Sequence, residues 1–189
     1  MASILIPVSA GFEEVELVSL IDVLRRGGAE VRTAYVDSSE LGTDLILGAN
    51  GITIKTDTAL KNVISEDFDM ILLSGGWDNA YTLSDNRRVQ ELIKEFNRDG
   101  KVVGAMCASV LALKKAEVLG SDYTCYPFAK DEINHEGYRD DKMVVTDGNI
   151  MTSKGPGTAL CFGLEILKRM VGEESYLAVK EGMLLDFCK

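Results

Sequence analysis

The chain has 189 residues, 20 of them basic and 30 acidic, so its formal net charge is −10. Because no stretch concentrates lysine or arginine, we expect neither nucleic acid nor an anionic membrane as a partner. No apolar run is long enough to cross a bilayer, and the run at residues 4–8 lacks the basic flank of a secretory signal. Length and composition predict one cytoplasmic domain spanning residues 1–189.

The four cysteines are widely spaced and form no C-x-x-C pair: Cys107, Cys125, Cys161 and Cys188. This spacing resembles neither a disulfide framework nor a zinc site, so we expect reduced thiols in a reducing compartment and no metal. Cys161, on the apolar side of an expected helix, is predicted to lie in the core. Cys125 and Cys188 are candidates for exposed thiols, although neither has a helix N-terminus or a basic neighbour to activate it.

The first part of the chain predicts a βαβ unit. Residues 3–8 are a short apolar strand, and an apolar stripe at helical spacing begins at Leu17 and is ended by Gly27 and Gly28. Residues 29–36 alternate like a second strand. This order favours a parallel sheet with a right-handed crossover.

The middle of the chain continues this pattern. Two β-prone runs within residues 44–56 flank Asn50-Gly51, which indicates a hairpin with a type I′ turn. Residues 69–73 and 101–106 are buried strands, and residues 86–98 between them form an amphipathic helix.

The last part of the chain begins with a polar, irregular stretch at residues 125–141. A strand pair is expected at residues 143–146 and 149–152, a helix begins at Gly155-Pro156-Gly157, and residues 173–185 form a final helix. The whole pattern predicts an α/β fold, a three-layer α/β/α sandwich around a mostly parallel sheet.

The strand at residues 101–106 runs without a loop into Cys107 and then into an apolar helix. This geometry is that of a nucleophile elbow, which requires small residues two positions on either side, and Ala105 and Ser109 meet that requirement. The helix N-terminus would favour thiolate over thiol and make Cys107 nucleophilic and oxidisable. The alternative is a buried cysteine acting as a small hydrophobic residue.

Ligands of open parallel sheets bind beyond the carboxyl ends of the strands. After the strand at residues 69–73 stand Gly75 and Gly76, whose N–H groups, with that of Ala108, could form an oxyanion hole. The simpler interpretation is that this glycine pair only permits a tight turn.

Three glutamates follow the first strand: Glu13, Glu14 and Glu16. Acidic residues in a first helical turn often only complement the helix dipole. Glu16, however, directly precedes the buried stripe and could point into the crevice, while Glu13 faces water. A carboxyl group near a thiolate tends to be protonated, so Glu16 could hydrogen-bond to the sulfur and act as general acid and base, the two titrating as a coupled pair.

His135 is the only histidine, and it lies in the polar stretch rather than beside Cys107. A cysteine protease needs an imidazole at the sulfur, so that activity would require His135 to fold back onto the elbow. The preferred interpretation is a solvated loop residue.

Five segments occur in a recognisable order: FEEVE after the first strand, SGG after a middle strand, AMCAS at the elbow, YPFAKDEI downstream and TSKGPGTA before a long helix. Together they resemble the ThiJ/PfpI superfamily, in particular its Parkinsonism-associated protein deglycase branch. The resemblance covers essentially the whole chain.

The resemblance implies a flavodoxin-like fold, a homodimer, an easily oxidised Cys107 and a protonated Glu16. The oxyanion positions would be Gly76 and Ala108, with the GPGT element as structural support for the pocket. Members act as glyoxalases on methylglyoxal, as deglycases on early glycation adducts, or as redox-responsive chaperones. We therefore expect small reactive aldehydes or glycated protein side chains as substrates, with no metal or organic cofactor.

The chain also departs from the family at four positions. PfpI proteases have a histidine directly after the nucleophile, where this chain has Ala108, and some deglycases have one at Tyr126. Ser74 replaces the usual proline, and Trp77 replaces a smaller polar residue and is expected to narrow the pocket mouth. The leading hypothesis is a glyoxalase or deglycase using Cys107 and Glu16. The alternative is a redox sensor or chaperone acting through Cys107 oxidation, and an amidase or peptidase is disfavoured.

Overall fold

The computed structural model describes residues 1–36 and 44–188. Within them, the main sheet has the strand order β5-β2-β1-β6-β7-β9-β8, with every neighbouring pair parallel except the antiparallel β8–β9. Its strands are β1 (Ser3–Val8), β2 (Glu30–Tyr35), β5 (Thr58–Ala59), β6 (Met70–Leu73), β7 (Val102–Met106), β8 (Val144–Asp147) and β9 (Ile150–Ser153). The predicted α/β fold with a mostly parallel sheet is confirmed.

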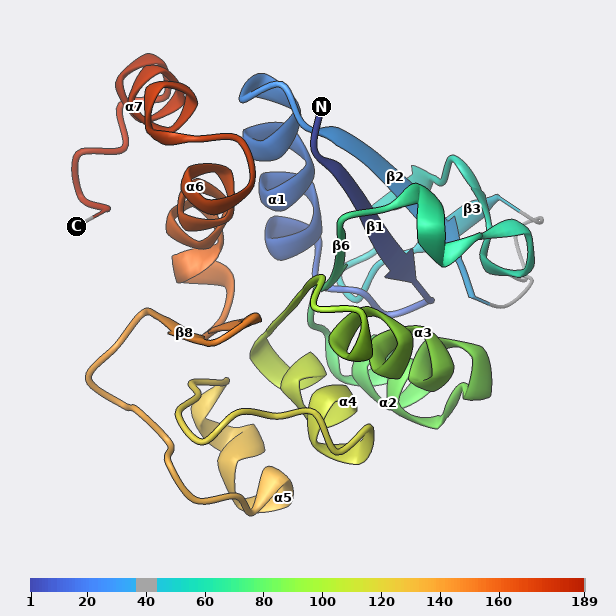
Figure 1. Cartoon of the computed structure of the whole chain (residues 1–189). Helices are drawn as coiled ribbons and strands as arrows, with labels where there is room; N and C mark the ends of the chain where they lie inside the picture. Colours follow the sequence, from blue (N-terminus) through green and yellow to red (C-terminus); the bar gives the residue numbers. More distant parts are fainter. Residues whose placement is uncertain (37–43, 189) are drawn as a thin grey trace.

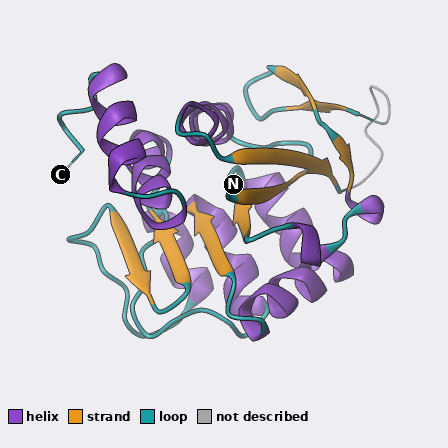
Figure 2. Ribbon diagram, turned by 45° about the horizontal axis from the view of Figure 1, so that its top comes forward, coloured by secondary structure: helices purple, strands orange, loops and turns teal. Residues whose placement is uncertain are grey.

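Helices cover both faces of this sheet (Figure 2). On one side α1 packs on α6 and α6 packs on α7, and on the other α2, α3 and α4 pack together (Figure 1). These helices are α1 (Glu14–Arg26), α2 (Trp77–Asp85), α3 (Arg87–Arg98), α4 (Val110–Lys115), α6 (Ala159–Met170) and α7 (Glu173–Gly182). The layers therefore match the predicted sandwich.

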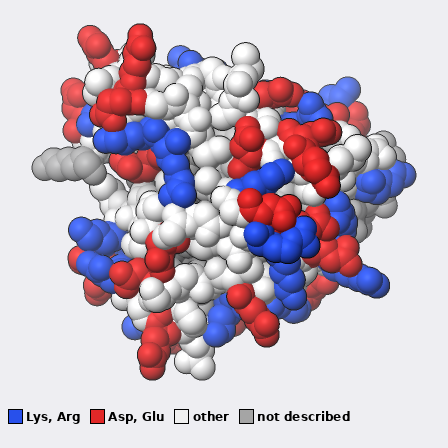
Figure 3. Space-filling view, viewed as in Figure 1, with Lys and Arg blue, Asp and Glu red and all other residues white. Residues whose placement is uncertain are grey.

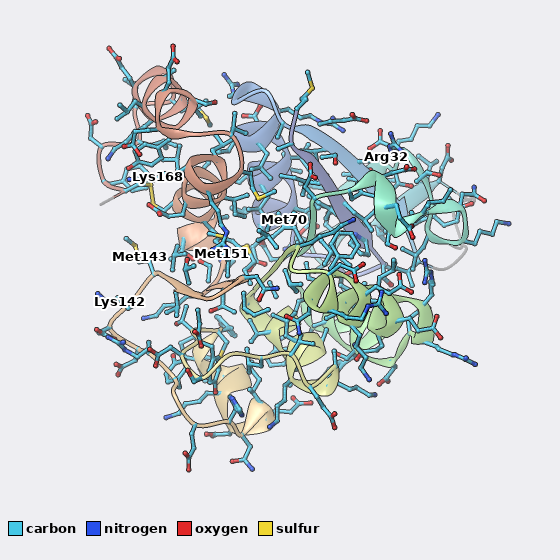
Figure 4. The ribbon with its side chains drawn as sticks, in the orientation of Figure 1. Arg32, Met70, Lys142, Met143, Met151 and Lys168 are labelled. Atoms are coloured by element: carbon cyan, nitrogen blue, oxygen red, sulfur yellow. A yellow bond between two sulfur atoms is a disulfide. The ribbon has the colours of Figure 1, made fainter. Side chains whose placement is uncertain are left out.

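The core follows the hydrophobic periodicity of the elements. Strands β6 and β7 are buried along their whole length, as expected for central parallel strands covered on both faces. Met70 of β6 and Met151 of β9 are buried among the layers (Figure 4). Strands β6 and β7 therefore hold the residues that follow them, Ser74 and Cys107, at the end of the buried core.

The predicted hairpin is confirmed as β3 (Leu45–Leu47) paired antiparallel with β4 (Thr53–Lys55). The type I′ turn is wrong, because the connection spans residues 48–52 and Gly51 has a positive φ whereas Asn50 does not. The short helix α2, directly after Gly76, was not predicted, and the last helix ends at Gly182 rather than at residue 185.

The irregular stretch contains only short helical turns, η4 (Pro127–Ala129) and α5 (Lys130–Ile133). The element at residues 155–157 begins the turn η5 (Pro156–Thr158), which leads into α6 as predicted. The remaining short turns of the described chain are η1 (Leu60–Asn62), η2 (Ser65–Asp67) and η3 (Cys107–Ser109).

Two of the four cysteines contradict the expectation of reduced thiols. Cys161 of α6 forms a disulfide with Cys188, because the chain after α7 turns back onto α6 (Figure 4). Cys161 is buried as predicted, but Cys125 and Cys188 are buried too, so neither is the exposed thiol considered above. The Cys161–Cys188 disulfide depends on tertiary contact between residues 27 positions apart in the sequence.

The surface carries both signs of charge. On the face drawn in Figure 3, acidic and basic side chains are interspersed rather than gathered by sign. In the part of the chain that the structure describes, no helix is both long and apolar enough to span a bilayer.

Candidate active site

Cys107 stands at the sharp junction of β7 and the turn η3, which leads into α4. Its φ is 59°, a conformation that costs a non-glycine residue about 1–3 kcal/mol and that is found mainly at functional sites. Ala105 and Ser109 are buried beside it, as the elbow requires, and the Ser109 hydroxyl donates to the Ser74 carbonyl at 2.6 Å. The predicted nucleophile elbow is thus present.

Gly75 and Gly76 lie against this elbow, and the space around each excludes a side chain. A Cβ on residue 75 would lie 2.5 Å from both Cys107 Cβ and Glu16 Oε2. Gly76 has a φ of 94°, and a Cβ there would collide with the Gly11 carbonyl oxygen. The glycine pair therefore permits close approach of two chain segments as well as a tight turn.

Glu16 points into the site, as predicted, and its side chain is completely buried. Its Oε2 accepts the Gly75 N–H at 2.7 Å, and the carboxyl group is hydrogen-bonded to the Cys107 thiol. No nitrogen or oxygen within the described residues hydrogen-bonds to Oε1. Burial raises the pKa of Glu16 to about 7, although the hydrogen bonds from Cys107 and Gly75 oppose this shift.

The surroundings of the Cys107 sulfur change the expectation of a ready thiolate. Burial raises the pKa of the thiol, and so do the charge of ionised Glu16 and the hydrogen bond to it. The N–H groups of Ala108 and Gly76 donate to the sulfur and act in the opposite direction. Cys107 is only 7% exposed, so burial disfavours the thiolate. While Glu16 is ionised, burial and the charge of Glu16 together outweigh the lowering of the thiol pKa that was expected from the helix N-terminus. The thiol then needs a base, and Glu16 is in contact with it.

The expected oxyanion donors divide into two groups. The Gly75 N–H is committed to Glu16, so this residue holds the carboxylate in place rather than facing the sulfur. The N–H groups of Gly76 and Ala108 face the sulfur, where an oxygen of a bound carbonyl compound would need them.

The three glutamates have three different partners. Glu13 does not simply face water: it caps α1, accepting the Glu16 N–H at 2.7 Å. Glu14 is buried and accepts the backbone and side-chain N–H groups of Asn50, which ties the β3–β4 hairpin to the start of α1. Of the three, only Glu16 contacts the sulfur. The interpretation that an acidic residue in the first turn only complements the helix dipole therefore fits Glu13 alone.

Asn79, which sequence reasoning missed, connects two strand ends at the site. Its Oδ1 accepts the Ser9 N–H at 2.8 Å, and its Nδ2 donates to the carbonyls of Ser74 and Gly75 at 2.9 and 3.2 Å. An asparagine inside a helix competes with helical hydrogen bonding, and this was the one available signal. Asn79 therefore helps to fix the loop that carries Gly75.

Tyr126 and Gly155 border the space above the sulfur. A Cβ on Gly155 would lie 3.4 Å from Tyr126 Cδ2, 3.9 Å from Glu16 Oε1 and 4.0 Å from Cys107 Sγ, so a side chain there would occupy this space. Thr158 accepts the Gly155 N–H and holds this glycine in position.

His135 lies outside this group. Its ring nitrogens interact with Lys114 Nζ at 3.3 Å and with the Gly120 carbonyl at 3.1 Å, so it is a half-buried, hydrogen-bonded loop residue. Among the residues that the structure describes, no three His, Cys, Asp or Glu side chains are placed to hold a metal ion.

A cysteine elbow at the carboxyl edge of a parallel sheet, with a buried glutamate against the sulfur, defines a flavodoxin-like α/β protein with a cysteine-centred site. Residues 2–169 match the DJ-1/PfpI family, and the chain belongs to that family. The predicted ThiJ/PfpI resemblance is confirmed.

Similar proteins include relatives from animals, a plant and a parasite. The chain is 35% identical to Drosophila melanogaster protein dj-1beta over 98% of both chains, and the crystal structure of that protein superposes with a TM-score of 0.90 over 97% of each. It is 37% identical to the Caenorhabditis elegans glutathione-independent glyoxalase DJR-1.2, over 86% of this chain and 84% of the relative. The structure of oxidized Toxoplasma gondii DJ-1 gives a TM-score of 0.89 at 29% identity, over 97% and 98% of the chains. The chain spans only 41% of the longer Arabidopsis thaliana protein DJ-1 homolog B.

Proposed function

We propose that this protein is a cysteine-dependent glyoxalase that needs neither glutathione nor a cofactor. The observation that carries the proposal is the convergence of three groups on one sulfur: the Glu16 carboxyl, and the N–H groups of Gly76 and Ala108. The Caenorhabditis elegans relative named as a glutathione-independent glyoxalase supports the same activity.

The first step forms a carbon–sulfur bond. Cys107 Sγ adds to the aldehyde carbon C1 of methylglyoxal, and ionised Glu16 takes the thiol proton. The N–H groups of Gly76 and Ala108 stabilise the developing alkoxide, which then receives the proton from Glu16 to give a hemithioacetal. A carboxyl group with a pKa of about 7 can take and return this proton near neutral pH.

The second step moves a proton along the substrate. Glu16 removes the hydrogen on C1 and returns a proton to C2 through an enediol, while the C1 hydroxyl proton moves to the C2 oxygen. The product is a lactoyl thioester of Cys107, which water cleaves to lactate and the free thiol. Methylglyoxal and water thereby give lactate, with no external oxidant or reductant.

The same addition would act on early glycation adducts of protein side chains, which is the deglycase form of the proposal. Peptide or amide hydrolysis is disfavoured. Ala108 stands where the family resemblance implies a histidine in PfpI proteases, Tyr126 stands where it implies one in some deglycases, and His135 is bonded elsewhere.

The test is lactate formation from methylglyoxal by the purified protein without glutathione. Wild type should turn over, and Cys107→Ser and Glu16→Ala should be inactive. Cys125→Ala should retain activity, because this second free thiol is buried and donates to the Tyr126 carbonyl rather than to Glu16. No turnover above Cys107→Ser, with Cys107 verified as reduced, would refute the glyoxalase.

A second candidate function is redox sensing through oxidation of Cys107, as in a redox-responsive chaperone. The oxidized state of the Toxoplasma gondii relative supports it, as do the N–H donors and the Glu16 carboxyl that could hold sulfinate oxygens. Mass spectrometry after mild peroxide treatment should find two added oxygens selectively on Cys107. Equal oxidation of Cys125 would count against a sensor.

Homodimer formation, expected from the resemblance, is also proposed. A scattering mass near that of one 20.6 kDa chain would refute it.

A further inference from the structure

Four aromatic side chains form a continuous strip beside the site. Trp77 stacks on Tyr81, with ring centroids 5.8 Å apart, and meets the edge of Tyr126 at 6.4 Å. Tyr126 in turn contacts Phe128 at 5.5 Å. The strip joins the first turns of α2 to the segment that begins η4, so two parts of the chain almost 50 residues apart build one surface. We call these four residues the aromatic strip.

The aromatic strip is open to solvent. Trp77 is 37% exposed, Tyr81 43% and Phe128 79%. Single exposed apolar residues are common, but rings in mutual contact expose a contiguous apolar surface, which marks binding sites on soluble proteins. Aromatic rings also favour stacked or edge-on contacts with another ring.

The strip reaches the reacting sulfur. Trp77 directly follows Gly76, whose N–H faces Cys107 Sγ, and the Tyr126 N–H donates to the Cys107 carbonyl at 3.4 Å. The Tyr126 ring also borders the space over the sulfur that Gly155 leaves open. A carbonyl carbon bonded to Sγ would therefore have the Tyr126 ring, which Trp77 meets edge-on, beside its substituent.

The charges around the strip favour an uncharged planar group. Asp78 of α2 lies against Gly11, and Asp85 is paired with Lys115. The Tyr81 hydroxyl donates to Glu132 at 3.1 Å, which engages that carboxylate. The Glu132 and Asp85 carboxylates are thus engaged, and the strip itself offers ring carbons.

We propose that the aromatic strip is a specificity subsite for the aryl group of 1,2-dicarbonyl substrates. The protein would then convert phenylglyoxal and water to mandelate in preference to converting methylglyoxal to lactate. This inference rests on the proposed function and adds a substrate class to it. The chemistry at Cys107 and Glu16 stays the same, with a phenyl group in place of the methyl group.

A binding measurement tests the strip without any turnover. Trp77 is the only tryptophan in the chain, so its fluorescence reports directly on occupancy of the strip. Mandelate and lactate carry the same charge and differ only in that mandelate has a phenyl group where lactate has a methyl group. We expect a saturable change with mandelate at a Kd at least about tenfold below that for lactate, and a loss of this difference in Phe128→Ala and Tyr81→Ala. Phe187→Ala, which removes a 57% exposed ring of the C-terminal segment, is the matched control and should behave as wild type.

A kinetic measurement tests specificity. The ratio of kcat/KM for phenylglyoxal to that for methylglyoxal should exceed about ten in wild type and fall about tenfold in Trp77→Leu and in Phe128→Ala. Because Phe128 is largely exposed, its removal does not threaten folding.

The outcomes separate the two proposals. Turnover of both compounds with equal kcat/KM, together with mandelate binding no tighter than lactate, would overturn the subsite and leave the glyoxalase. No turnover of either compound would overturn the glyoxalase, and the Trp77 fluorescence would still decide whether the strip binds an aryl group.

Discussion

Two of the regions that hold buried cysteines differ in what surrounds the sulfur. Cys107 lies at a strained backbone position beside a titratable carboxyl and two N–H donors. Cys161 and Cys188 lie against each other, joining α6 to the segment after α7. One residue type thus serves two purposes, and its neighbours decide which. The first region brings a carboxyl group and N–H donors to one sulfur, as the proposed reaction requires, whereas the second links two segments of chain.

The largest expected effect is the loss of turnover in Cys107→Ser. A hydroxyl is a much weaker nucleophile than a thiol near neutral pH, so lactate formation from methylglyoxal should fall by more than about a thousandfold. The free energy of unfolding should change little, because the replacement is nearly isosteric. Retained turnover in this variant would place the chemistry elsewhere and remove the contrast between the two sulfur regions.

The next effect is on stability and falls on the other region. Cys188→Ala opens a loop with a sequence separation of 27, which should lower the free energy of unfolding by about 3–4 kcal/mol in urea titrations. Turnover should stay within about twofold of wild type. Reduction of the wild-type disulfide by a dithiol should reproduce the loss of stability, whereas a matching loss of activity would show that the two regions are coupled.

A third prediction concerns the pH dependence of stability. The Glu16 carboxyl has an ordinary pKa near 4.5 when unfolded and about 7 when folded, so between these values the unfolded chain has released a proton that the folded protein retains. Stability should therefore fall by about 3 kcal/mol as the pH rises from about 4.5 through the folded pKa, and should level off above about pH 8, where the carboxyl is ionised in both states.

Glu16→Gln supplies the comparison for this slope, because an amide does not titrate. Urea titrations from pH 4.5 to 7.5 should give a flatter profile for Glu16→Gln than for wild type. Parallel profiles would mean that the Glu16 pKa is not raised by folding.

The smallest expected effect comes from Gly75→Ala. The new Cβ would lie 2.5 Å from Cys107 Cβ and from Glu16 Oε2, so the elbow must shift at a cost of about 1–3 kcal/mol. Thermal unfolding and lactate formation should both register this shift. Gly182→Ala, at the end of α7, is the control. Its Cβ would meet no atom within 4 Å, so this substitution should leave stability unchanged or raise it slightly. Equal stability of the two variants would contradict the close approach of Gly75 to the site.

The sequence by itself determined most of the elements and the position of the elbow cysteine. Strand β1 was predicted with its exact bounds, and the elbow at Cys107 was predicted because strand, small residues and helix are adjacent in the chain. Such signals are carried by hydrophobic periodicity and turn chemistry within about ten residues. The proximity of Glu16, Gly76 and Cys107 also followed, since parallel strands place their carboxyl ends at one edge.

Only the tertiary structure decided what those residues do to one another. The Cys161–Cys188 disulfide, the commitment of the Gly75 N–H to Glu16 and the hydrogen bonds of Asn79 all depend on segments brought together by packing. For the same reason, the predicted direction of the shift in the Cys107 pKa was wrong. Burial and the charge of Glu16 raise this pKa through space and leave no local pattern in the sequence. The aromatic strip, built from α2 and η4, likewise exists only once the chain has folded.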